Sequence, residues 1–266
     1  MTAPRFSPLR LMASQPLAAG FGFVLLALVL PACAMQMIDL RLLGGASVWL
    51  KPTKFLVSIG IFALTAAWFA GHVRPERRGS IPVVLSIAFL VIGGMFEIGY
   101  IGFQGWQGEA SHFNKSTPFH ATMYSLMGFF AVMLITSTLP LAWEIARRPG
   151  RSLSREMQVA IVIGLLLTFM LGGTLGGMIS LNGGHAVGPE GQGIWLLGWN
   201  RLGGDLRVPH FLGIHAEQAI PLLAYLSLRL PARFRMAAIV GGAVVWTGIT
   251  LLLFLQASAG LPLFPV

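Results

Sequence analysis

The sequence predicts an all-α integral membrane protein, built as a bundle of seven transmembrane helices. Of its 266 residues, 55% are hydrophobic and only 10% are charged, and the mean hydropathy is +0.76. Soluble domains do not have this composition. Apolar runs of roughly 18 or more residues recur along the chain, and each is long enough to cross a hydrocarbon core of about 30 Å. We expect the lipid bilayer to be the main partner. The basic residues behind the net charge of +9 are expected to anchor the helices at anionic lipid headgroups. We expect no nucleic-acid partner.

The predicted helices form a single transmembrane domain over residues 1–266. Pro118 and Pro209 each open a helix, in the first turn that tolerates proline best. The expected spans are 17–38, 50–71, 81–103, 118–142, 157–180, 209–229 and 236–257. The longer connections 104–117 and 181–208 are expected to cap one side, and the second carries Trp195 and Trp199, which favour an interface.

The distribution of arginine and lysine predicts the orientation. Twelve of the 18 basic residues lie at the N-terminus or in alternate connections: Arg5, Arg10, Arg74, Arg77, Arg78, Arg147, Arg148, Arg151, Arg155, Arg229, Arg233 and Arg235. The other six lie on the opposite side. The positive-inside bias therefore predicts a cytoplasmic N-terminus and a periplasmic C-terminus in a bacterial inner membrane, with both cap loops in the periplasm.

The first predicted helix carries Cys33, the only cysteine of the chain. A single cysteine excludes an intrachain disulfide and a multi-thiolate metal site. The simplest interpretation is a small residue packed in a helix. The alternative is a cleaved signal, of the lipoprotein or the signal-peptidase kind, which would leave six helices.

Helices 50–71 and 81–103 carry polar faces near their periplasmic ends. Lys51 and Lys54 are three residues apart, and they either snorkel to headgroups or balance a buried carboxylate or an anionic ligand. Glu97, Tyr100 and Gln104 follow the spacing i, i+3, i+7 and share one face. An ionised Glu97 in the membrane must be protonated or paired, because an isolated charge there is costly.

Helix 118–142 begins beside further polar groups. His120 lies in its first turn, and His112 and Asn114 precede it in the loop. In helix 157–180, four glycines, Gly172, Gly173, Gly176 and Gly177, either allow close helix packing or leave space for a flat ligand.

Helix 209–229 also carries polar residues, on two faces. His210 and Glu217 share one face, whereas His215 and Gln218 share another. Asp205 and Arg207 come directly before it. Five of the six histidines, all except His72, thus fall on the predicted periplasmic side at the depth of two buried glutamates, which favours a functional pocket there.

Three motifs carry a resemblance to a group of bacterial polytopic membrane proteins without known activity. They are Trp49-Leu50-Lys51-Pro52-Thr53-Lys54-Phe55, Ser111-His112-Phe113-Asn114, and Gly204-Asp205-Leu206-Arg207-Val208-Pro209-His210-Phe211-Leu212-Gly213-Ile214-His215. The resemblance implies a multi-helix membrane protein and singles out the same residues, but it implies no activity. Zinc-dependent seven-helix hydrolases match in architecture only, because the last helix here has no histidine.

The first functional hypothesis is a metal or haem protein with redox or hydrolytic chemistry. A transition metal would be held by histidines from the set His112, His120, His210 and His215 together with Glu97, and Glu217 would act as a general base or orient a ligand. Haem b would sit between His120 and His215 beside the glycines.

The second hypothesis is a proton-coupled transporter or a lipid- or anion-binding protein without a cofactor. Lys51, Lys54 and Arg207 would hold an anionic group, and the carboxylates and histidines would carry protons. Further candidate ligand-binding residues are Tyr100, Gln104, Asn114, Asp205 and Gln218. In either case a small molecule or lipid would enter from the periplasmic side. A third hypothesis is a structural or assembly factor whose polar residues only fix helix packing.

Overall fold

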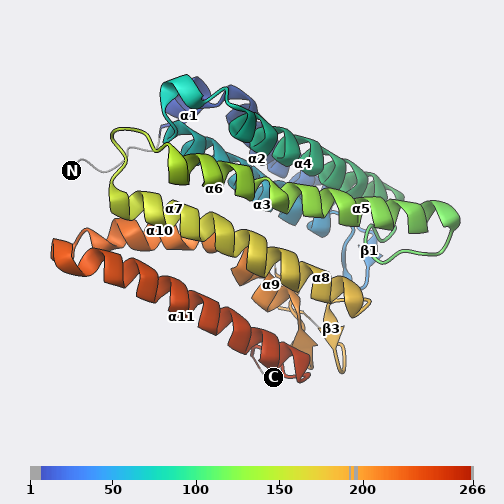
Figure 1. The fold of residues 1–266 in the computed structure, drawn as a ribbon. Helices are drawn as coiled ribbons and strands as arrows, with labels where there is room; N and C mark the ends of the chain where they lie inside the picture. Colours follow the sequence, from blue (N-terminus) through green and yellow to red (C-terminus); the bar gives the residue numbers. More distant parts are fainter. Residues whose placement is uncertain (1–6, 192, 195–196, 265–266) are drawn as a thin grey trace. The chain divides into compact units, whose positions relative to one another are not determined.

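The computed structural model describes residues 7–191, 193–194 and 197–264, so Trp195 lies outside the described residues. The chain divides into two compact units, residues 1–141 and 142–266, whose boundary falls within α6 (Thr138–Arg147). Both units consist mainly of α-helices, with short two-stranded sheets in the connections (Figure 1). We describe each unit by itself.

The described part of the chain contains six helical segments that are long and apolar enough to cross a membrane. These segments are Pro16–Ile38, Leu50–Gly71, Ile81–Gln107, Pro118–Arg147, Arg155–Leu181 and Ala232–Ser258. The chain is therefore an all-α, multi-pass membrane protein. The predicted seventh span, 209–229, is not among them because it is divided into two shorter helices.

Unit 1 is built on α3, which packs against α2 and α4, while α4 packs against α5. A Cβ placed on Gly22 of α2 would lie 3.0 Å from the carbonyl oxygen of Gly60 in α3, so these two helices approach closely at glycines. The elements are α1 (Pro8–Ser14), α2 (Pro16–Ile38), β1 (Leu42–Leu43), β2 (Ala46–Ser47), α3 (Leu50–Gly71), η1 (Pro75–Arg77), α4 (Ile81–Gln107) and α5 (Pro118–Thr136).

Two boundaries in unit 1 differ from the sequence prediction. α4 continues to Gln107 and ends at Gly108 in the left-handed conformation, so Gln104 belongs to the helix and not to the cap loop. The predicted helix 118–142 is interrupted at Ser137, between α5 and α6. Pro140 lacks the N–H that would bond to the carbonyl of Thr136, which explains the break.

Unit 2 contains α7 (Arg155–Leu167), the π-helical turn η2 (Thr168–Gly172), α8 (Gly173–Leu181), β3 (Ala186–Val187), β4 (Gly204–Asp205), α9 (Arg207–Ile214), α10 (Ala216–Ser227) and α11 (Ala232–Ser258). α10 packs against α7 and α11, and α9 packs against η2 and α11 (Figure 1). The expected cap loop 181–208 has structure of its own, since β3 and β4 pair antiparallel within it.

Candidate functional site

In unit 1 three of the predicted residues, Lys51, Glu97 and His112, come together. Lys51 lies in the first turn of α3, Glu97 in α4, and His112 in the loop between α4 and α5. The Nζ of Lys51 is 2.9 Å from Nδ1 of His112, and Nε2 of His112 is 3.9 Å from Oε2 of Glu97. We call this group the unit 1 cluster. The imidazole of His112 lies between the ammonium of Lys51 and the carboxyl of Glu97.

The carboxyl of Glu97 is the most deeply buried member of the unit 1 cluster. Its side chain is 3% exposed, whereas the imidazole of His112 is 25% exposed. Oε1 of Glu97 and the hydroxyl of Tyr100, one turn along α4, are both buried without a hydrogen-bond partner among the described residues. Gln104, the third residue of that face, donates to the carbonyl of Ala110 at 3.2 Å and so holds the loop.

The loop that carries His112 is shaped by local interactions. Phe113 has φ of +61°, a conformation that a residue with a side chain rarely adopts. The hydroxyl of Ser111 lies 3.1 Å from Nδ1 of His112. Burial lowers the pKa of His112, and the Lys51 ammonium lowers it further, to about 3. The ring is therefore neutral at ordinary pH, beside an open pocket lined in part by Glu109 and Asn114.

His120 has different partners from those of the unit 1 cluster. Its Nε2 is 3.0 Å from Oε2 of Glu109, and its backbone N–H donates to the hydroxyl of Thr117, which caps α5. Asn114 lies nearby and its side-chain oxygen accepts from Ser116. These contacts fasten the loop to the start of α5. Lys54, one turn beyond Lys51 in α3, is partly buried.

In unit 2 the central feature is the break between α9 and α10 at His215. The backbone N–H of Glu217 donates to the hydroxyl of Thr168 at 2.9 Å, instead of continuing the helix. The indole N–H of Trp246 in α11 donates to the carbonyl of Leu212 at 3.1 Å. Side chains from two neighbouring helical segments thus supply the hydrogen bonds that the break removes from the backbone.

Thr168 is itself the first residue of the π-helical turn η2. Two interrupted spans therefore meet at one point, one with a π turn and one with a break. π turns are rare and frequently mark functional positions. Sequence reasoning identified neither Thr168 nor Trp246. The only sign of Thr168 was a polar residue within the apolar run, just before four glycines.

Glu217 lies directly after the break and is completely buried, with 0% exposure. Its Oε1 accepts from the side-chain amide of Gln218 at 2.8 Å, and the oxygen of that amide is 3.1 Å from Nδ1 of His215. Oε2 of Glu217 is buried without a hydrogen-bond partner among the described residues. In addition, Pro221 has no N–H to offer the carbonyl of Glu217.

Glycines bring the backbones close together around this point. A Cβ on Gly164 would lie 3.0 Å from the Cα of Glu217, and one on Gly213 would lie 3.0 Å from the backbone of Leu171 and Gly172. A Cβ on Gly176 would meet the ring of His210 at 3.1 Å. Close packing therefore explains these glycines, and the space beside Gly176 is filled by a side chain of the protein itself.

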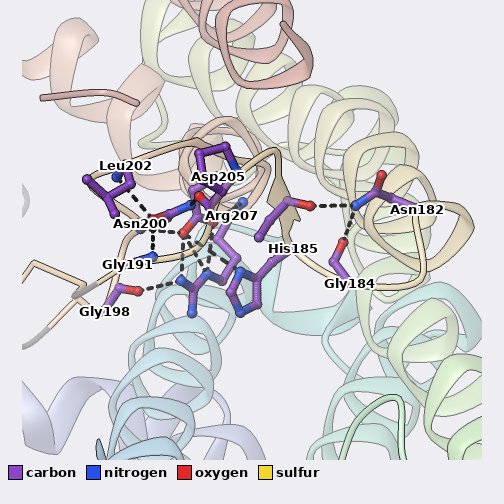
Figure 2. A network of polar contacts seen from close by, with 11 residues as sticks. Asn182, Gly184, His185, Gly191, Gly198, Asn200, Leu202, Asp205 and Arg207 are labelled. Carbon is purple, nitrogen blue, oxygen red and sulfur yellow. Dashed lines mark hydrogen bonds and ion pairs between the residues drawn. The ribbon is translucent and has the colours of Figure 1, made fainter. Parts of the chain in front are cut away.

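The loop before α9 is held by a polar network (Figure 2). The Nη2 of Arg207 is 2.6 Å from Oδ2 of Asp205, and the same guanidinium donates to the carbonyl of Gly198. Asp205 also accepts from the backbone N–H of Asn200 at 2.8 Å. Burial raises the pKa of Asp205, but the Arg207 hydrogen bond and charge bring it below its usual value. His185 lies 3.9 Å from the same carboxylate. Asp205 and Arg207 thus fix the loop.

The expected metal site has no geometric support in the described ranges. They contain no group of three or more His, Cys, Asp or Glu side chains that could hold a metal ion. His112 and His120 contact different partners in unit 1, while His210 and His215 lie in unit 2. The pairing of His120 with His215 around a haem joins residues of both units and stays a prediction.

No protein-family model matches the chain, and neither the curated proteins nor the solved structures give a match.

Proposed function

We propose that this protein is a secondary transporter of a bacterial inner membrane and that Glu217 carries its coupling proton. The observation that supports this most is the meeting of two interrupted helices at a buried carboxyl. Secondary transporters place substrate and coupling-ion sites at discontinuous helices, because backbone groups freed there can serve an ion pathway. A fully buried ionisable residue within a membrane protein is also costly unless it has a role.

The surroundings of Glu217 suit a group that gains and loses a proton. One carboxyl oxygen is bonded to Gln218, and the other is buried without a partner among the described residues. An ionised carboxylate in this position must acquire a cation or a proton. The side-chain amide of Gln218 bridges Glu217 and His215 by hydrogen bonds and so holds the carboxyl in place. The transported substrate is a small molecule or lipid that enters from the periplasmic side, where the basic residues place the cap loops.

Purified protein in liposomes that contain a pH-sensitive dye tests the proposal. A potassium diffusion potential, negative inside, should drive acidification of the lumen in the wild type. Glu217→Gln should slow it at least about tenfold, because the amide cannot release a proton at this site. Glu190→Gln is the matched control, since Glu190 is exposed in the cap loop. Equal rates in the wild type and Glu217→Gln, or no acidification in the wild type, would contradict the proposal.

A further inference from the structure

The unit 1 cluster has no part in the step proposed at Glu217. We propose that Lys51, His112 and Glu97 form a proton-exchange path between solvent at the α4–α5 loop and the buried carboxyl of α4. The physiological use of this path rests on the proposed transport function, whereas its chemistry does not.

The hydrogen-bond donors fix the direction of the path. A lysine ammonium has only donors, so Nδ1 of His112, 2.9 Å away, must accept. The proton of the neutral ring is then on Nε2, the atom that faces Oε2 of Glu97 at 3.9 Å. A movement of about 1 Å turns this approach into an ordinary hydrogen bond. The ring thus joins a donor on one side to an acceptor on the other.

Solvent exposure is greater at Lys51 and His112 than at Glu97, the inner end of the path. Lys51 is partly exposed, the ring of His112 is 25% exposed beside the open pocket, and the side chain of Glu97 is 3% exposed. Two other charges of the loop have contacts of their own: Glu109 is paired with His120 at 3.0 Å, and the Nζ of Lys115 lies 5.3 Å from the centre of the Tyr124 ring. Solvent therefore has a stepwise route to a carboxyl that is itself shielded from water.

Proton transfer along the path leaves no charge on the ring. The N–H bond at Nε2 breaks as an O–H bond forms at Glu97, and an N–H bond forms at Nδ1 as one breaks at the Lys51 ammonium. The resulting amine takes a proton from a water molecule of the open pocket, which leaves as hydroxide, and the reverse sequence, in which hydroxide takes that proton back, returns the proton. Because the pKa of His112 is about 3, the ring passes protons by changing tautomer and does not store them.

The test follows the carboxyl of Glu97 by infrared difference spectroscopy after a rapid pH jump, with the full-length protein in lipid nanodiscs. Glu97→Gln identifies the carboxylic-acid carbonyl band of this residue. We expect His112→Gln to slow the appearance of the band at least about tenfold and to keep its final amplitude. Lys51→Met should slow it similarly, since the ring then loses its proton donor. His120→Gln, a change of a neighbouring histidine outside the path, should have the wild-type rate.

Wild-type rates in both His112→Gln and Lys51→Met would overturn the path, as would the absence of any band that Glu97→Gln removes. Glu217→Gln separates this outcome from failure of the proposed transport function. If Glu217 has no role in transport, the liposome assay fails while the Glu97 band still depends on His112. If the path is wrong, the liposome assay is unaffected and the dependence on His112 is lost.

Discussion

At the scale of single residues, Thr168 caps the start of α10 at the break between α9 and α10, as a capping residue does at an ordinary helix end. It lies 49 positions before Glu217, has no exposed surface, and accepts the N–H of Glu217. Sequence reasoning identified Lys51, Glu97 and His112, which do come together, because charged and polar groups stand out in an apolar helix. It did not identify Thr168, because a threonine in a membrane helix usually bonds only to its own backbone.

We expect Thr168→Val to lower the free energy of unfolding by about 1–3 kcal/mol, since it leaves a buried N–H of Glu217 without an acceptor. Thr168→Ser keeps the hydroxyl and should retain most of the stability. Thr247→Val is the control, because the hydroxyl of Thr247 donates to the carbonyl of Ala243 in its own helix. Denaturant unfolding in detergent measures all three. A loss for Thr247→Val equal to that for Thr168→Val would show that no special contact exists.

His112 should make stability depend on pH. Its folded-state pKa of about 3 lies below its ordinary value of 6.5, so between these values the unfolded chain binds the proton and the folded protein does not. Stability should therefore fall as the pH falls below 6.5, by up to about 1.4 kcal/mol per pH unit. His112→Gln should remove this part of the slope. An unchanged slope in unfolding curves recorded between pH 4 and 7, a range set by roughly these pKa values, would mean that His112 titrates normally.

At the scale of the elements, the positions of the helices followed from hydropathy, but their interruptions did not. The predicted helix 157–180 contains a π turn, and 209–229 contains a break at His215. Neither has a proline at the interruption itself. The break at His215 is stable because side chains of other helical segments, Thr168 and Trp246, satisfy the backbone there. Such hydrogen bonds between helices depend on tertiary packing, and they leave no periodic pattern in the sequence.

The close approach of α9 to η2 predicts opposite effects of two glycine substitutions. Gly213→Ala would place a Cβ 3.0 Å from backbone atoms of Leu171 and Gly172, and we expect a loss of about 1–3 kcal/mol. Gly177→Ala meets nothing within 4 Å and should be neutral or stabilising by up to about 1 kcal/mol, because alanine favours a helix. Thermal unfolding compares the two. Equal effects would contradict the packing described for Gly213.

At the scale of the whole molecule, the single transmembrane domain stays a prediction, and the structure divides the chain into two compact units near its middle. Within the described residues, each unit has a buried glutamate with one oxygen that lacks a hydrogen-bond partner, Glu97 in the first and Glu217 in the second. The boundary could not be predicted from composition, because it falls inside the helical segment Pro118–Arg147 and not in a polar linker.

The orientation of the chain is tested by reporter fusions. Alkaline phosphatase fused after Asn114 should be active, because the distribution of basic residues predicts that this loop lies in the periplasm. A green fluorescent protein fused after Arg151, in the arginine-rich connection between α6 and α7, should be fluorescent in the cytoplasm. The reverse pattern of activity would invert the proposed topology and with it the direction of substrate entry.

The contacts around the break tie α9 and α10 to two neighbouring helices of unit 2. The Cα of Glu217 rests against Gly164 of α7, and Trp246 of α11 holds the carbonyl of Leu212 on the other side of the break. The segment that carries the carboxyl is therefore in contact with two flanking helices, α7 and α11. If Glu217 carries the proposed coupling proton, each protonation would therefore be felt by both neighbouring helices.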